Sequence, residues 1–195
     1  MSCGFDMKSN QVLRPEMGVD VIEPPTVKPP FVKPGLKPAI LAIAGTVVLI
    51  AAMIAAGVNA APHGSMGASA VFALLVLYKA ILHTGTGLAG LWAAAKFVDH
   101  RLNHVDLAGA RMFVAVAAFL LLWSLRLPIS IEFLEHTLRI LLAIACYWLV
   151  LFALFRRSRM ETTLIVLFHV GAAMFVEIGF SINAGLQAAV AAKPG

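Results

Sequence analysis

Long apolar runs are the feature that most constrains how this chain can fold. Beyond residue 37, stretches of about 20 or more mostly apolar residues follow one another, separated by short polar or Pro-containing segments. About 20 such residues in a helix cross the roughly 30 Å hydrocarbon core of a bilayer. The chain is 61% hydrophobic and 13% charged, whereas soluble domains are about 45–50% apolar and about 25% charged. The sequence therefore predicts an all-α integral membrane protein.

The breaks between the runs divide the chain into five predicted transmembrane helices. They cover about 38–57, 68–96, 107–125, 131–155 and 162–182. The second is too short for two crossings, which need roughly 35–40 residues plus a turn, so one helix with a flexure at Gly85–Gly87 is preferred. Ser158 and Glu161 have the spacing of a capping box that starts the last helix. A polar tail, 1–37, precedes the membrane domain, and a short outer tail, 183–195, follows it.

The N-terminal tail is rich in proline next to the first span. Residues 24–38 read PPTVKPPFVKPGLKP, a composition that favours polyproline II and does not nucleate a helix. One interpretation is a docking peptide for a partner protein. The interpretation we favour is a semi-rigid, positively charged linker beside the membrane.

The distribution of Lys and Arg predicts the orientation. With the N-terminus inside, eleven of these residues fall in inner segments and three in outer ones, as the positive-inside rule requires. The inner residues are Lys8, Arg14, Lys28, Lys33, Lys37, Lys96, Arg101, Arg111, Arg156, Arg157 and Arg159, and the outer ones are Arg126, Arg139 and Lys193. We therefore expect an N-in, C-out multi-pass protein, in a bacterial inner membrane. Basic residues at the ends of apolar runs serve topology, and we expect no nucleic-acid partner.

Four ionisable side chains lie inside the predicted spans, where each is a functional hypothesis: Lys79, His83, His169 and Glu177. Lys79 and His83 are four residues apart and share one helix face. Counted along their helices, Lys79 and Glu177 lie about 25 Å and about 24 Å from the inner ends. The matching depths predict an interhelical ion pair between them. The group is either a proton or ion path or a structural lock, and we favour the lock.

The histidines of the chain give only weak signals for a metal or haem site. His83 and His169 would suit haem b, but their heights along the helices differ by about 7 Å. His100 and His104 have a spacing that can bind a metal from one helical face. A second acid and imidazole cluster comprises Glu132, Glu135 and His136. The topology places these two clusters on opposite sides of the membrane, so we expect no metal site and no cofactor.

Small residues mark one face of the second predicted helix. Thr86, Gly90 and Ala94 repeat every four residues, and Gly87 lies beside them. Such spacing permits close approach of two helices in a membrane. We therefore expect these residues to pack against another helix.

The layout of the chain resembles that of Yip1-type membrane proteins. The resemblance rests on the Pro-rich tail, five spans, GLAGLWAAAKFVDHRLNHVDLAGARMF (87–113) and LFRRSRMETTLIVLF (154–168). It implies a non-enzymatic role in membrane organisation and assigns no functional residue. The sequence thus predicts a protein that acts through contacts with the bilayer, with other membrane proteins or with itself. The alternatives are a small proton- or ion-coupled transporter or channel component, and a haem- or metal-binding redox subunit.

Overall fold

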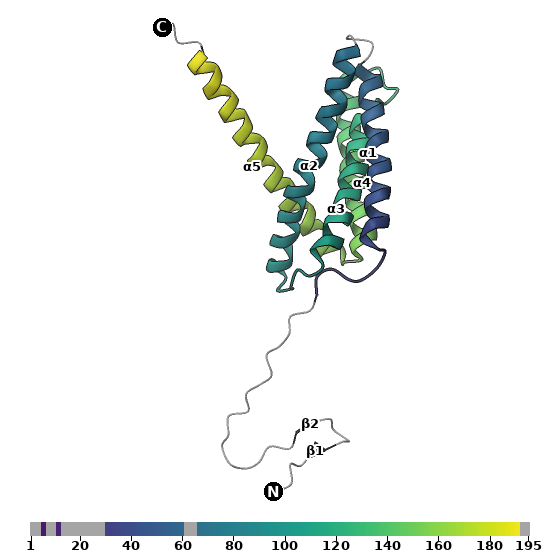
Figure 1. Ribbon diagram of the computed structural model, residues 1–195, viewed down its shortest axis with the longest axis vertical. Helices are drawn as coiled ribbons and strands as arrows, with labels where there is room; N and C mark the ends of the chain where they lie inside the picture. The colour runs from purple at the N-terminus through teal and green to yellow at the C-terminus, as the bar shows by residue number, and fades with distance from the viewer. Residues whose placement is uncertain (1–4, 7–10, 13–29, 61–65, 192–195) are drawn as a thin grey trace.

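Five long helices make up the membrane domain in the computed structural model, which describes residues 5–6, 11–12, 30–60 and 66–191 (Figure 1). The helices are α1 (Pro38–Ala60), α2 (Met66–Phe97), α3 (Val105–Ser124), α4 (Glu132–Phe155) and α5 (Arg159–Ala191). Each contains a stretch long and apolar enough to cross a membrane. The predictions of an all-α domain and of five helices long and apolar enough to span a membrane are confirmed. In the tail, β1 (Phe5–Asp6) and β2 (Gln11–Val12) form a short antiparallel pair.

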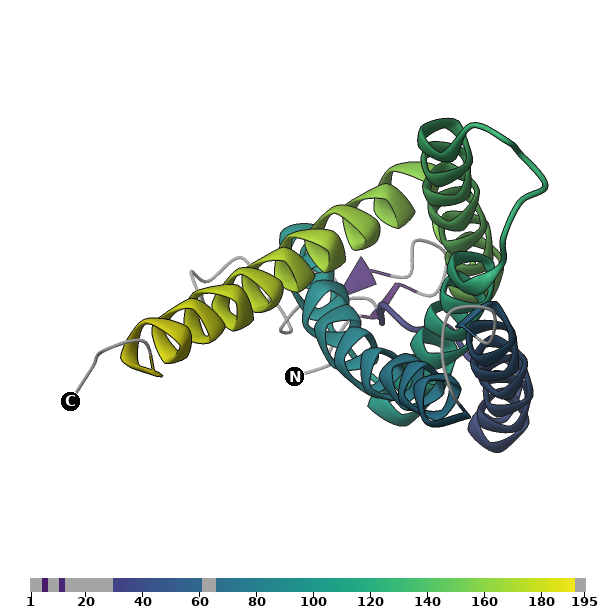
Figure 2. The same cartoon turned by 90° about the horizontal axis from the view of Figure 1, so that it is seen from above.

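α3 is the central helix of the bundle. It packs against α1, α2 and α4, and it is the most buried of the five. α5 packs mainly on α2 and much less on α4, and it leaves the other helices at an angle (Figures 1 and 2). We call the end with residues 98–104 and 156–158 the tail end, because the N-terminal tail leaves there. The opposite end, with residues 125–131, is the distal end.

The helix boundaries follow the predictions except in α5. α2 is a single continuous helix through Gly85–Gly87. The predicted capping box is confirmed, because the Ser158 N–H donates to Glu161 Oε2 (2.9 Å) and the Glu161 N–H donates to Ser158 Oγ (3.2 Å). However, α5 begins at Arg159 and continues past residue 182 to Ala191. The predicted outer tail is thus helical over much of its length, since Ala, Leu and Gln dominate it and favour helix.

α2 and α5 cross with their backbones in close contact. A Cβ atom at Gly90 would lie 2.6 Å from the backbone N of His169, so only glycine fits. A Cβ at Gly87 would meet Met112 of α3 at 2.6 Å. Thr86 and Ala94, on the same face, are buried. The predicted small-residue face therefore lies between α2 and its neighbours, where close approach of helices needs it.

The last residues of the tail pack onto the tail end of the bundle. Phe31 and Val32 are fully buried. The Phe31 N–H donates to the Arg101 carbonyl (2.8 Å), and the Val32 N–H donates to Asn103 Oδ1 (3.0 Å). We call this segment, residues 30–33, the clasp.

Arg157, in the turn between α4 and α5, holds the clasp from the other side. Its guanidinium donates to the Pro30 carbonyl (2.7 Å) and to that of Phe31, and it lies 4.5 Å from the centre of the Phe31 ring. The linker predicted for residues 1–37 is thus corrected at its end. The buried side chains of Phe31 and Val32 supply apolar contact there. Arg157 donates hydrogen bonds to the backbone carbonyls of Pro30 and Phe31, which have no partner within the extended segment itself.

Replacing Gly90 with alanine should separate α2 from α5. We expect Gly90→Ala to destabilise the protein by about 1–3 kcal/mol, because the new methyl group overpacks a backbone contact. The matched control is Gly85→Ala in the same helix, where a Cβ meets no atom within 4 Å. Unfolding of the purified protein in detergent measures both variants. Equal stability of the two would contradict this account of the crossing.

Candidate functional site

The four predicted intramembrane residues border two adjoining cavities in the middle of the bundle. The central cavity, of about 340 Å³, lies between α2, α3, α4 and α5 and is bordered by His83, Tyr147, His169 and Glu177 among apolar side chains. The connecting cavity, of about 210 Å³, is bordered by Lys79, His83 and Glu177. Residues more than 90 positions apart in the sequence thus converge on one region of the bundle.

A buried tyrosine and two histidines form the polar centre of this region. Tyr147 of α4 and His169 of α5 share a hydrogen bond between the phenol oxygen and Nδ1. The Tyr147 hydroxyl also donates to the sulfur of Met112 (3.2 Å). The ring centres of His83 and His169 are 5.7 Å apart. The Nε2 atom of His169 is buried and has no hydrogen-bond partner within the described part of the chain.

The two histidines approach each other although their heights differ. Counted from the observed helix ends, Phe97 and Arg159, His83 and His169 lie about 6 Å apart in height, close to the predicted difference. Their rings nevertheless meet edge to face, at an interplanar angle of 67°. A Soret band in the absorption spectrum of the purified protein would show that the pair binds haem.

Tyr147 is the member of this cluster whose role sequence reasoning missed. It packs between helices, with 4% of its surface exposed. The hydrogen bond to His169 was not anticipated. A tyrosine in mid-span was the available signal, because a buried phenol usually finds a hydrogen-bond partner and His169 was one of few polar candidates.

Lys79 and Glu177 do not form the predicted ion pair. Among the described residues, the ion pairs within 4 Å are Arg139–Glu135 and Arg157–Glu161, each between residues four apart. The two predicted partners instead border the connecting cavity. α5 diverges from α2 beyond their crossing at Gly90 (Figure 1), and at this level the two helices meet through Tyr78 and Phe180, whose ring centres are 6.4 Å apart. Matching depth along two helices does not determine which side chains face each other.

The predicted histidine and acid clusters are far apart. His100 lies in the tail-end loop, where its Nδ1 is 2.7 Å from the Val98 carbonyl and its ring packs edge-on against Phe31. His104 precedes the first residue of α3 in a left-handed conformation, so the pair does not share a helix face. The second cluster begins α4 at the distal end. Over the described ranges, no group of three or more His, Cys, Asp or Glu side chains could hold a metal ion.

The arrangement combines acid, base and imidazole groups beside apolar cavities at membrane depth. Such groups are costly in hydrocarbon and typically face a partner, a ligand or water. No protein family, curated protein or solved structure matches the chain. Its function is therefore argued from the geometry.

Removing the Tyr147 hydroxyl should destabilise the protein, because it leaves the buried imidazole of His169 without its hydrogen-bond partner. We expect Tyr147→Phe to lower the free energy of unfolding by about 1–3 kcal/mol, because His169 Nδ1 loses its partner in an apolar setting. Tyr78→Phe is the control: the only other tyrosine in the chain, it is 48% exposed and should change stability by less than about 0.5 kcal/mol. Denaturant unfolding in detergent compares them. Indistinguishable losses would show that the hydrogen bond contributes nothing.

Proposed function

We propose that the protein is a non-enzymatic, multi-pass membrane protein that acts by association within the bilayer, first of all with a second copy of itself. The single observation that carries this proposal is the open side of the bundle between α5 and the other helices. Ionisable side chains border the cavities there, and the described part of the chain offers them no ion-pair partner. Lipid tails cannot solvate such groups.

The distal half of α5 supports an interface at this side. Beyond the crossing with α2, its apolar side chains are exposed, with Phe175 at 80% and Met174 at 59%. Lipid covers apolar side chains as well as protein does, so these residues alone do not require a partner. Glu177 lies among them and is exposed as well, and a carboxylate in that position does require one.

Charge complementarity favours a second copy as the partner. Lys79 and Glu177 each lie 18 residues from the tail-end terminus of their helix, about 27 Å along the axis. A two-fold axis along the membrane normal keeps every residue at its own depth. In such a symmetric dimer each copy contributes the same surface, so Lys79 of one copy can meet Glu177 of the other, and the reverse. The intramolecular pair expected from the sequence is thereby replaced by two intermolecular ones.

A charge-swap experiment tests this pairing. Lys79→Glu alone or Glu177→Lys alone should weaken self-association at least about tenfold, because like charges then face each other. Mixing the two single variants should restore association, since both contacts become attractive in the mixed pair. Energy transfer between labelled copies in lipid vesicles measures the mixed and unmixed pairs.

Controls separate this pairing from other roles of the same residues. Lys96→Glu, which reverses a charge at the tail end of α2, should leave association unchanged. A wild-type protein that stays monomeric in vesicles, or variants that mix at random, would refute the dimer.

If Glu177→Gln instead changed ion flux through vesicles without changing association, the cavities would belong to a transporter. That is the second candidate function, favoured because Lys79, His83 and Glu177 border a shared cavity.

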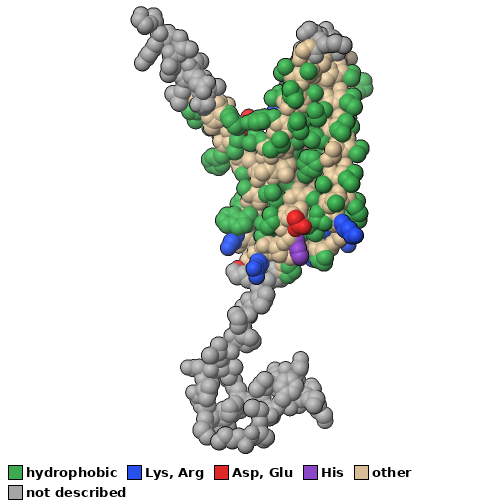
Figure 3. Space-filling view, viewed as in Figure 1, with side chains coloured by type: hydrophobic (Ala, Val, Ile, Leu, Met, Phe, Trp, Pro, Cys, Tyr) green, Lys and Arg blue, Asp and Glu red, His purple; other side chains and the backbone are tan. Residues whose placement is uncertain are grey.

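Charge distribution supports the N-in orientation that we propose. Of the predicted inner residues that the structure describes, Arg101, Arg156 and Arg157 lie at the tail end. In Figure 3, hydrophobic side chains cover most of the visible face, and Lys and Arg gather at its tail end. An inner membrane of a bacterium, and the role in membrane organisation implied by the Yip1-type layout, are parts of the same proposal.

Cysteine labelling tests the orientation. In a Cys146→Ser background, Cys3 is the only remaining cysteine. We expect a membrane-impermeant maleimide to modify Cys3 only after right-side-out vesicles are opened, because the tail lies inside. Ser130→Cys, made in a chain without the two native cysteines, is the matched reporter for the distal end and should react in closed vesicles. The reverse pattern would invert the topology.

A further inference from the structure

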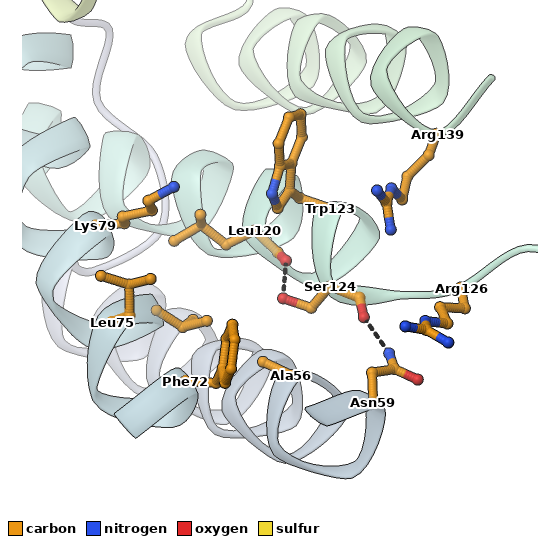
Figure 4. Close-up of a pocket in the computed structure, with 11 residues that line it drawn as sticks. Ala56, Asn59, Phe72, Leu75, Lys79, Leu120, Trp123, Ser124, Arg126 and Arg139 are labelled. Carbon is orange, nitrogen blue, oxygen red and sulfur yellow. Dashed lines mark hydrogen bonds between the residues drawn. The ribbon is translucent and has the colours of Figure 1, made fainter. Parts of the chain in front are cut away.

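A third cavity, of about 410 Å³, lies at the distal end of the bundle and has a chemistry of its own (Figure 4). α1, α2, α3 and α4 all contribute to its wall, together with the loop that follows α3. We call it the distal cavity. Two arginines stand on one side of it, and Lys79 stands on the other side beside the apolar residues of α2 (Figure 4).

Lys79, Arg126 and Arg139 border the distal cavity, and none of the described residues that border it is acidic. Arg139 is already engaged, because its guanidinium lies 3.6 Å from Glu135 and 5.9 Å from the Trp123 ring centre. Lys79 and Arg126 form no ion pair with any residue that the structure describes. Within one copy, two positive charges on the wall are therefore left for a ligand, and the charge of Arg126 is left in the proposed dimer as well.

A hydrogen bond between the ends of α1 and α3 holds the rim of this cavity. The Asn59 side-chain amide, at the end of α1, donates to the Ser124 carbonyl at the end of α3. The Ser124 hydroxyl donates to the Leu120 carbonyl within α3 (2.7 Å), and Figure 4 shows both bonds. The end of α3 is thus fixed two residues before Arg126, which favours a preformed position for this cation.

The apolar side of the distal cavity reaches the surface that faces lipid. Phe72 and Leu75 of α2 border the cavity and are 50% and 45% exposed. Ala56 and Leu120 continue the apolar wall inward. A hydrocarbon chain can therefore run from the bilayer along this wall without leaving an apolar environment.

We propose that the distal cavity binds an anionic amphiphile from the bilayer, with a carboxylate or phosphate head and at least one hydrocarbon chain. The head lies in the cavity that Lys79 and Arg126 border from opposite sides, where a cation gives it a charge-assisted hydrogen bond. The chain lies against Phe72 and Leu75. A free inorganic anion would leave the apolar wall unused. This inference goes beyond self-association, and Arg126 separates the two, since it borders the distal cavity but not the connecting one.

Quenching of Trp123 fluorescence by a brominated fatty acid provides the test. Trp123 borders the cavity, and in a Trp92→Phe, Trp148→Phe background it is the only tryptophan left. We expect 9,10-dibromostearate to quench it saturably in the full-length protein in detergent. Lys79→Gln and Arg126→Gln should each raise the dissociation constant about tenfold, the effect of losing one charge-assisted hydrogen bond. Lys79→Arg keeps the charge and should retain binding.

Three comparisons make the outcome decisive. Arg101→Gln removes a positive charge at the tail end and should leave the dissociation constant unchanged. The methyl ester of the same fatty acid carries no charge, so quenching by it at the same concentration would overturn the anionic site. Displacement of the probe by inorganic phosphate as readily as by dodecyl phosphate would show a site for free anions and overturn the amphiphile. Absence of saturable quenching in the parent protein would overturn the site altogether.

Discussion

The close contact between α2 and α5 at Gly90 is the interaction on which the functional geometry depends. Lipid tails are as apolar as the helix surfaces, so helices in a bilayer associate through packing of complementary shapes and through polar contacts. α5 packs little on α4, and its position is therefore set mainly by α2. At the crossing, His169 is brought beside His83 and within hydrogen-bond reach of Tyr147. Beyond it, the two helices separate and leave Lys79 and Glu177 facing cavities.

Polar groups of the membrane domain lie at three levels, and their partners differ from one level to the next. At the tail end, Arg157 pairs with backbone carbonyls and with Glu161. At mid-depth, Tyr147 and His169 satisfy each other in an apolar setting. Toward the distal end, cations border a cavity at which the described residues place no acidic group. Lys79, Arg126 and Glu177 have no ion-pair partner in the described part of the chain. The proposals for a second copy and for an amphiphile therefore both fall beyond the α2–α5 crossing.

Much of the fold could be predicted from the sequence, whereas the lateral arrangement of the helices could not. Apolar length predicted five spans, and the Ser158–Glu161 spacing predicted the start of α5 because both are local properties. Residue counting along a helix gives depth but no lateral position, and the Lys79–Glu177 contact failed for that reason. The Tyr147–His169 bond joins two helices whose approach depends on a third, so no local pattern encodes it. The burial of Phe31 was not predicted, because the prolines around it led us to interpret the whole tail as a linker.

The clasp gives the tail an unusual mechanical connection to the membrane domain. Residues 30–33 contact the loop before α3 and, through Arg157, the turn that launches α5. A pull on the tail is therefore delivered to that turn before it reaches the first residue of α1. Because α5 is held chiefly at one crossing, a small rotation of its starting turn is magnified along its length, as in a lever. A displacement of the clasp would in this way change the opening between α5 and the bundle.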